Sequence, residues 1–301
     1  MFESQQEVEV ATESGFGFAS APLFKPHIRQ VQGPLAQYLT ALIAMEVAPL
    51  PPTELFIVPH ESVLLTVHLG PRASSFECGD ARGMSVALTA LRETLGVSHP
   101  PGNCVTLFAV LTPLGAIALL RGRDLQGVPR VREPLASVLD LQTTLQLEAC
   151  LRMYSSIEGK LDCFGKWIEQ RVLAPRALGQ AAHRTARVAM QILARPHLPI
   201  DEIARAEHVS SRQLERDFRR WLAVSPKRVA QTARLQQAAR LAHRGLSLAQ
   251  VASEARFADQ AHMSRSIHQL TGRTPRQLFA PARHPMALAF RQVTGGGLVY
   301  A

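Results

Sequence analysis

Residues 210–220 read SSRQLERDFRR, and this stretch decides how the last third of the chain is interpreted. Leu214 and Phe218 are four residues apart, so in a helix they lie on one face. The other faces carry four arginines: Arg212, Arg216, Arg219 and Arg220. Ser210 or Ser211 can cap the first turn, and no proline interrupts the helix before Pro226. The pattern suits a helix that docks on a domain with one side and meets nucleic acid with the other, but it is also typical of a solvated charged face.

The basic charge of the chain is concentrated around this stretch. Residues 1–180 contain 14 Lys and Arg against 17 Asp and Glu, a net charge of −3. Residues 181–283 contain 18 against 7, a net charge of +11, and the 301-residue chain carries +9. The length is sufficient for two domains. Such asymmetry is typical of a polyanion-binding module joined to a near-neutral domain.

A supersecondary unit is repeated in the basic region. The positions that recur at an offset of 48 are Ile203-Ala204 with Val251-Ala252 and Val209 with Phe257. Those that recur at an offset of 49 are Leu214 with Met263, Arg216 with Arg265, Phe218 with Ile267, and Ser225-Pro226 with Thr274-Pro275. Each copy has the pattern of a helix-turn-helix, whose second helix enters the major groove of DNA. A rigid helix between the copies could hold the two second helices about 34 Å apart, at adjacent major grooves.

The pattern of apolar residues and breaks predicts the element order. Residues 21–178 favour α+β, with a helix over Leu35–Val47, strands over 54–58, 63–69, 84–88 and 105–111, and helices over 135–154 and 160–173. Leu111–Leu120 is interpreted as a core strand followed by a core helix. The remainder is all-α, with helices at 182–194, 200–206, 211–221, 226–243, 248–255, 260–269 and 276–279.

The predicted fold is therefore an α+β N-terminal domain followed by an all-α DNA-binding domain, in which a long helix joins two helix-turn-helix units. We expect a disordered N-terminus over 1–20, an effector or dimerisation domain over 21–178, the double unit over 179–283 and a tail over 284–301. Candidate core or dimer-interface positions on the helices that close the first domain are Leu139, Leu145, Leu151 and Ile168.

Three segments resemble the AraC/XylS-type transcriptional regulators over about residues 185–280: IDEIARAEHVSSRQLERDF, SPKRVAQTARLQQAARLA and FADQAHMSRSIHQLTGRTPRQLF. The resemblance implies a bacterial sequence-specific regulator, usually an activator, that binds double-stranded DNA in two adjacent major grooves. RNA polymerase, a small-molecule effector and a second copy of the chain are the further partners expected. The turn glycine common in this family is His208 in the first unit and Arg256 in the second, and Ala223 replaces the glycine before Ser225.

Carried over by position, the resemblance supplies the candidate DNA contacts. Base-reading candidates in the first unit are Arg212, Glu215 and Arg216, with Ser211 and Gln213 beside them. Phosphate contacts are expected from Arg219, Arg220, Lys227 and Arg228, and contacts of the second unit from Gln260, His262 and Arg265. Asp259 is interpreted as a helix cap. Arg234 is interpreted as a buried structural residue paired with a carboxylate such as Glu202 or Asp217.

Other kinds of chemistry have weak signals. The four cysteines are far apart, which favours a reduced, cytoplasmic protein over a disulfide framework. We expect no signal peptide, membrane segment, catalytic site, metal or cofactor, although His60, Glu61 and His68 could be imagined as metal ligands. The alternatives are an enzyme fused to a DNA-binding module, either amidotransferase-like around Cys104 or a DNA-repair methyl acceptor, and a constitutive DNA binder without a ligand.

Overall fold

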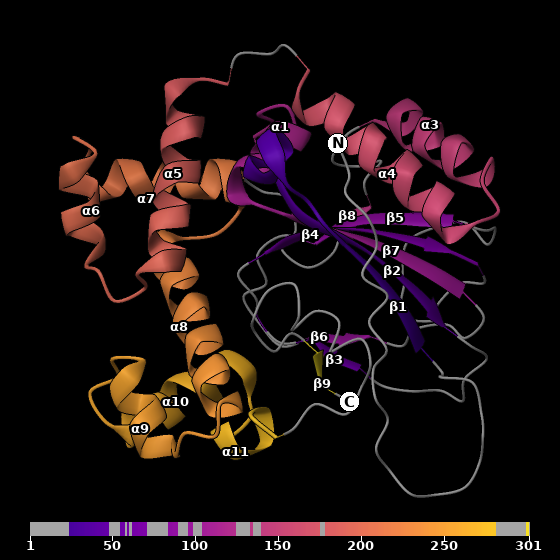
Figure 1. Cartoon of the computed structure of the whole chain (residues 1–301). Coiled ribbons are helices and arrows are strands. Elements are labelled where there is room, and N and C mark those ends of the chain that lie inside the picture. Colours follow the sequence, from indigo (N-terminus) through magenta and orange to yellow (C-terminus); the bar gives the residue numbers. More distant parts are fainter. Residues whose placement is uncertain are drawn as a thin grey trace, which may run out of the picture.

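The computed structural model describes residues 24–47, 55–57, 59, 62–70, 84–89, 96–98, 104–124, 133–134, 140–174, 178–280 and 299–300. The predictions for residues 1–20, for most of the tail and for Leu139, His60 and Glu61 lie outside these ranges. Figure 1 shows a part built on β-sheet beside a part built of helices alone. This arrangement confirms the predicted fold class, α+β followed by all-α.

Two antiparallel sheets form the first part. The larger has the strand order β1 (Phe24–Gln30), β2 (Leu39–Val47), β7 (Cys104–Leu111), β4 (Val63–Leu69), β5 (Met84–Thr89) and β8 (Glu133–Pro134). The smaller has the order β6 (Gly96–Ser98), β3 (Leu55–Ile57) and β9 (Val299–Tyr300), and lies below the larger sheet in Figure 1. The predicted strands at 63–69 and 105–111 are confirmed.

The predicted helix over Leu35–Val47 is wrong. The chain forms the short 3-10 helix η1 (Gly33–Gln37) and then the central strand β2. Residues 41–45 of β2 are all fully buried, so both faces of the strand are covered. A strand that is buried on both faces has a continuous apolar run instead of an alternating one, and periodicity cannot distinguish such a run from a buried helix.

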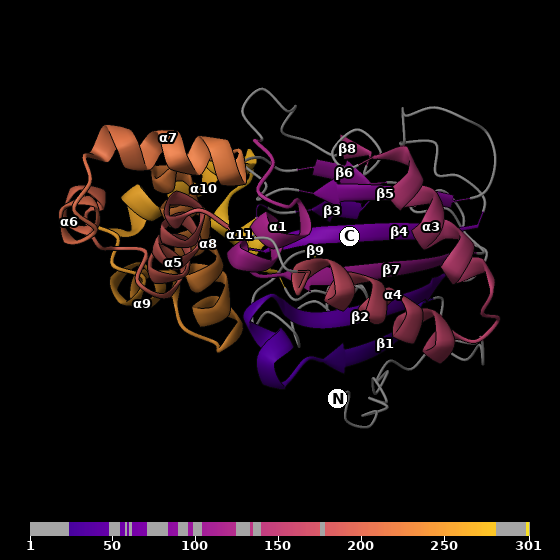
Figure 2. The ribbon, with the colours of Figure 1, turned by 90° about the horizontal axis from the view of Figure 1, so that it is seen from above.

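Three helices belong to the first part. α3 (Leu141–Arg152) and α4 (Ile157–Val172) lie over one face of the larger sheet (Figure 2). α1 (Pro113–Leu119) follows β7 directly, and almost all of its residues are buried. The segment Leu111–Leu120 is thus a core strand end and a core helix, as predicted. Of the candidate interface positions, Leu151 and Ile168 are buried and Leu145 is half-exposed.

The prediction that the cysteines stay unpaired is wrong for two of them. Cys150 of α3 and Cys163 of α4 form a disulfide, with their Cα atoms 6.5 Å apart. The two residues are 13 positions apart in sequence, and the antiparallel helix pair brings them together. Spacing in the sequence does not reveal this, because it depends on which sides of the two helices face each other. Cys104 is a free, buried thiol.

The second part consists of helices α5 (Gln180–Ala194), α6 (Ile200–Ala206), α7 (Ser211–Leu222), α8 (Pro226–His243), α9 (Leu248–Glu254), α10 (Gln260–Thr271) and α11 (Pro275–Leu278). The predicted limits of α6 and α8 are reproduced, and the other five helices agree within a few residues. We call α6 and α7 the first unit and α9 and α10 the second unit.

The hydrophobic core is divided unequally between the two parts. One cluster of buried side chains runs from the larger sheet through α1, α3, α4 and α5 into the first unit and ends at Val229 of α8. The second unit has a separate cluster, which runs from Leu235 of α8 to Leu278 of α11. The first unit is therefore packed into the β-sheet part, and α1 is the element between them, in contact with both α5 and α7.

Candidate nucleic-acid interface

The two units repeat the same backbone geometry at their turns. In the first, the backbone N–H of Val209 donates to the Ala204 carbonyl at 3.0 Å; in the second, that of Phe257 donates to Ala252 at 2.9 Å. The residues just before these donors, His208 and Arg256, have φ of 55° and 56°. Side chains at such left-handed positions cost roughly 1 kcal/mol relative to glycine. The turn keeps this conformation without a glycine because the backbone hydrogen bond and the buried packing of the two helices stabilise it.

The repeat continues past the second helix of each unit. Ala223 ends α7 with φ of 56°, and Gly272 ends α10 with φ of 67°. Two residues after Ala223, the Ser225 hydroxyl accepts a hydrogen bond from the Arg228 backbone N–H and starts α8. Thr274 starts α11 in the same way by accepting from Gln277. The internal repeat found in the sequence is thus a repeat of structure.

α7 is held from its inner side by a buried carboxylate. Leu214 and Phe218 are fully buried, as predicted. Between them on the helix, the Asp217 side chain is 5% exposed and accepts hydrogen bonds from Arg184 of α5 at 2.6 Å and from the Gln213 amide at 2.7 Å. Gln213, a predicted base contact, is therefore engaged with the protein itself. The role of Arg184 was not found from the sequence.

The other predicted contact residues on the outer side of α7 fall into two groups, those without and those with a partner in the described part of the protein. Arg212 and Arg216 are exposed, and within the described residues neither has a hydrogen bond or an ion pair. The other side chains have partners: Ser211 donates to Asp201 at 2.5 Å, Arg219 pairs with Glu215 at 2.8 Å, and Arg220 lies 3.3 Å from Asp124. Arg220 also stacks on the Trp221 ring. Arg212 and Arg216 are the two cations of α7 that need no rearrangement before they meet a ligand.

The second unit presents fewer cations. Gln260 and Arg265 are exposed on α10. Asp259 caps this helix by accepting from the His262 backbone N–H at 2.6 Å, as interpreted from the sequence. The His262 ring accepts from the Ala258 N–H at 3.3 Å and meets the Phe257 ring edge-on. Only Arg265 of this set carries a permanent positive charge.

The predicted carboxylate partner of Arg234 is wrong. Its guanidinium is half-buried, donates to the Pro196 carbonyl at 3.2 Å and lies over the Phe257 ring, 5.4 Å from its centre. Asp217 is already paired with Arg184. Burial lowers the pKa of Arg234 from its ordinary value. A carbonyl and an aromatic face replace the expected ion pair, so no carboxylate among the described residues compensates the charge of Arg234.

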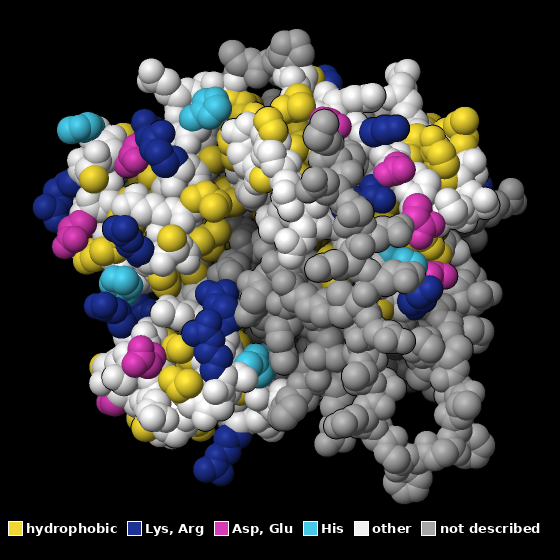
Figure 3. Space-filling view, viewed as in Figure 1, with side chains coloured by type: hydrophobic (Ala, Val, Ile, Leu, Met, Phe, Trp, Pro, Cys, Tyr) yellow, Lys and Arg dark blue, Asp and Glu magenta, His cyan; other side chains and the backbone are white. Residues whose placement is uncertain are grey.

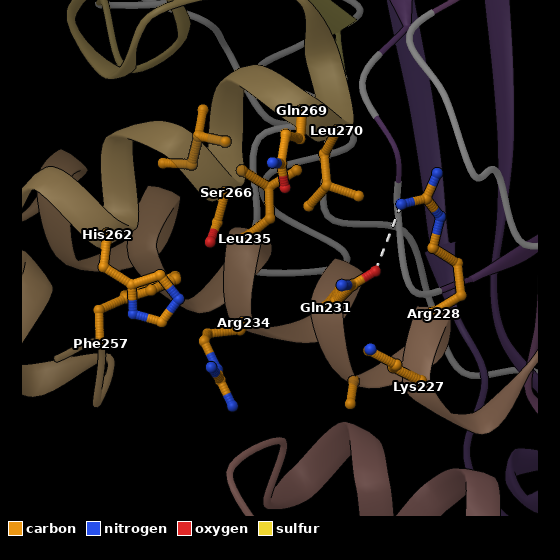
Figure 4. A pocket seen from close by; sticks show the side chains of 12 residues that line it. Lys227, Arg228, Gln231, Arg234, Leu235, Phe257, His262, Ser266, Gln269 and Leu270 are labelled. Carbon is orange, nitrogen blue, oxygen red and sulfur yellow. Dashed lines mark hydrogen bonds between the residues drawn. The ribbon is translucent and has the colours of Figure 1, made fainter.

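A cavity of about 270 Å³ lies between α8 and α10 and is shown in Figure 4. It brings together three predicted contact residues, Lys227, Arg228 and His262, with Gln231 and Ser266, which the sequence reasoning missed. Helical spacing could have found these, because Gln231 is four residues after Lys227 and Ser266 is four after His262. Figure 3 shows Lys and Arg side chains along α8, between the two helical lobes.

An ion pair away from the predicted DNA contacts connects the first unit to α5. Arg187 of α5 donates two hydrogen bonds to the carboxylate of Glu207, at the end of α6. The hydrogen bond from Arg187 is the main reason that the pKa of Glu207 is lowered from its ordinary value. The pair ties α6 to α5 on the surface.

The lowered pKa of Glu207 sets the sign of a pH effect. The pair stabilises the fold above the pKa of Glu207 in the unfolded chain, and this stabilisation is lost as the pH falls through the lower folded pKa. Glu207→Gln should therefore be less stable than the parent at pH 7, by about 1 kcal/mol or less because Arg187 is exposed, and the difference should shrink toward pH 3. Urea unfolding at both pH values measures it. Glu202→Gln, on the same helix, is the control; a pH-independent difference for Glu207→Gln would contradict the pairing.

Of the residues considered for enzymatic or metal-site chemistry, Cys104 and His68 lie within the described part of the chain. Cys104 begins β7, and burial raises the pKa of its thiol, whereas a nucleophilic cysteine needs a lowered pKa. The ring of His68 shares a hydrogen bond with Thr106. Within the part of the chain that the structure describes, no three His, Cys, Asp or Glu side chains gather as metal ligands. None of the described helices is long and apolar enough to cross a membrane.

The two units match a known protein family. Residues 203–280 match a protein family described as a helix-turn-helix domain, which confirms the AraC-type identification for this region. No curated protein matches the chain by sequence. Similar solved structures include a 1.65 Å structure of ToxT from Vibrio cholerae, at 10% identity and a TM-score of 0.41, covering 86% of this chain and 98% of that one. Another is the AraC-like transcriptional activator CuxR, at 13% identity and a TM-score of 0.22, covering 65% and 74%. Scores this low do not establish a shared function.

Proposed function

We propose that this chain, whose residues 203–280 form a helix-turn-helix domain of the AraC type, is a sequence-specific transcription regulator that reads two adjacent major grooves of DNA. The observation that carries the proposal is the structural repeat of the unit together with the exposed Arg212 and Arg216 on the second helix of the first copy. Arginine can bind guanine O6 and N7 with two hydrogen bonds, so this surface suits direct readout of bases. Arg219, Arg220, Lys227 and Arg228 would hold phosphates and fix the register.

The contacts of α7 refine the roles proposed for its residues. Glu215 and Arg219 neutralise each other on the surface, and an exposed pair of this kind contributes less than about 1 kcal/mol, so DNA can displace it at little cost. Gln213 is held by the buried Asp217 and is the weakest candidate for a base contact. In the second unit, Gln260, His262 and Arg265 would make the corresponding contacts.

Selection of bound duplexes from a random library by the full-length protein tests the proposal. We expect an enriched site with two conserved segments whose centres are about 10 base pairs apart, one for each unit. DNase footprinting on that site should protect both segments on one face of the duplex. The absence of any enriched sequence, with equal affinity for all duplexes, would refute sequence-specific regulation.

Arg216→Ala should weaken binding to the selected site by about 1 to 3 kcal/mol and relax the preference at one base pair. The folded state should be unaffected because the side chain is exposed. Fluorescence anisotropy on the site and on its single-base-pair variants measures both effects, with Arg244→Ala, which removes the same charge outside both units, as the control. An equal loss on specific and random DNA would identify Arg216 as a phosphate contact instead.

The β-sheet part is proposed to act as the effector or dimerisation domain of the regulator. Its support is the continuous hydrophobic core that joins the larger sheet to the first unit through α1, because a change in the packing of the sheet then reaches α7 directly. A small-molecule effector should raise the melting temperature of the full chain and change its affinity for the selected site. Activation through RNA polymerase, homodimerisation and a cytoplasmic location complete the proposal; in vitro transcription and the mass of the protein–DNA complex test the first two.

A further inference from the structure

The cavity between α8 and α10 is lined by cationic and neutral side chains. Three of the residues that line it are cationic, namely Lys227, Arg228 and Arg234, and none is an Asp or a Glu. The neutral polar residues of the lining carry hydrogen-bond donors in their hydroxyl, amide or imidazole groups. A concave site with several donors and no carboxylate is complementary to an anion.

Two rows of side chains face each other across the cavity. Lys227, Gln231 and Arg234 are spaced i, i+4 and i+7 on α8, so they share one side of that helix. His262, Ser266 and Gln269 have the same spacing on α10. In Figure 4, the Ser266 hydroxyl is directed from α10 toward α8, whereas the Arg234 guanidinium is directed away from α10, consistent with its hydrogen bond to Pro196. The floor is apolar and is formed by buried side chains of the second core cluster, Leu235, Ile267 and Leu270.

The cations of this lining are not neutralised by the part of the chain that the structure describes. Arg228 donates to the uncharged Gln231 amide at 3.3 Å, and Arg234 donates to the Pro196 carbonyl. The Nε of Arg234 is buried without a hydrogen-bond partner in the described residues. Charged guanidinium groups that leave water normally receive a carboxylate or a phosphate in return. An external anion would supply the counter-charge that this lining lacks.

We propose that this cavity binds a phosphate group, which bridges Lys227 of α8 and Ser266 of α10 and thereby fixes the second unit against the joining helix. The phosphate has two sources with the same chemistry: the DNA backbone between the two grooves, which rests on the proposed function, or a free phosphate ion. α8 connects α7 with the second unit, so a backbone phosphate here would lie between the two segments that the units read. The site adds an orienting contact that no base needs to specify.

The first arm of the test uses no DNA. The melting temperature of the full chain is measured in inorganic phosphate and in chloride at equal ionic strength, for the parent, Lys227→Gln and Lys166→Gln. Lys227 and Lys166 are both exposed helix residues, so each variant should fold, and Lys166 on α4 is the matched control for charge. A free-phosphate site should give a shift of several degrees in the parent and in Lys166→Gln, and a much smaller one in Lys227→Gln.

The second arm uses duplexes of the selected site that carry one neutral methylphosphonate, moved along the backbone. At the phosphate held in the cavity, neutralisation should cost the parent and Lys166→Gln about tenfold in affinity and cost Lys227→Gln almost nothing. Lys227→Gln should also reduce the slope of log affinity against log salt by about 1. Ser266→Ala, on α10, should lose less affinity than the parent when that phosphate is neutralised, but more than Lys227→Gln.

The outcomes separate the two hypotheses. A phosphate-specific shift in the first arm, or coupling of Lys227 to one phosphate in the second, supports the site and identifies its source. If the parent binds the selected DNA normally, and neither the shift nor the coupling appears, the phosphate site is overturned and the proposed function stands. If the parent binds no DNA specifically, the proposed function fails, and the first arm alone decides whether the cavity binds phosphate.

Discussion

Replacing Gly115 with alanine is expected to destabilise the protein by about 3 kcal/mol, although alanine is the better helix former. A Cβ atom at this position of α1 would lie 1.8 Å from the carbonyl oxygen of Tyr38. That oxygen cannot move away easily, because it accepts the backbone N–H of Thr112 at 3.0 Å at the start of the same helix. Either α1 must move away from β2 and η1, or the hydrogen bond must break.

The loss in Gly115→Ala should appear in urea unfolding of the full chain as a lower midpoint. Gly179→Ala is the matched control, since Gly179 has φ of −64° and a Cβ atom there would meet no described atom within 4 Å. The control should change stability by a few tenths of a kcal/mol. Equal stability of the two variants would show that α1 does not pack closely against Tyr38.

Removing the buried carboxylate of α7 is expected to have a similar or larger effect. Asp217→Ala leaves the guanidinium of Arg184 partly buried without its partner and deprives the Gln213 amide of an acceptor. Breaking a buried ion pair from one side costs about 3 to 5 kcal/mol, and the lower end applies here because the Arg184 side chain is 20% exposed. DNA binding should fall with it, since the pair sets how α7 lies on α5.

The same helix supplies the control for the carboxylate. Glu215→Ala removes an exposed carboxylate whose i,i+4 pair with Arg219 contributes about 0.5 kcal/mol or less. A double-mutant cycle with Arg184→Ala should return a coupling energy of at least about 1 kcal/mol for Arg184 and Asp217. Additive effects in that cycle would mean that the two side chains do not interact in solution.

The helical part could be predicted closely because its signals are local. Ser225 and Pro226 start α8 and Gly245 follows its end, so the limits of that helix are present in a few neighbouring residues. The turns at His208 and Arg256 were located from the family resemblance, even though neither residue is a glycine. Leu214 and Phe218 were identified as core from their spacing alone.

Features that depend on distant parts of the chain could not be predicted in the same way. β2 was mistaken for a helix because its neighbours bury both of its faces. The partners of Arg234 and Arg220 lie in distant parts of the chain, so only the folded structure shows that Arg234 meets Pro196 and Arg220 meets Asp124. The disulfide between Cys150 and Cys163 and the cavity between α8 and α10 likewise arise from the mutual orientation of two helices.

Because the hydrophobic core is divided unequally, we expect the two helix-turn-helix units to respond differently to destabilisation of the β-sheet part. A fragment starting at Gly179 would contain both copies, yet it would expose to water the apolar sides of α5 and α7 that α1 covers. We therefore expect this fragment to be less stable than the full chain. Because the first unit shares its buried cluster with the sheet and the second unit has its own, we expect unfolding of the sheet to affect Arg212 and Arg216 more strongly than Arg265.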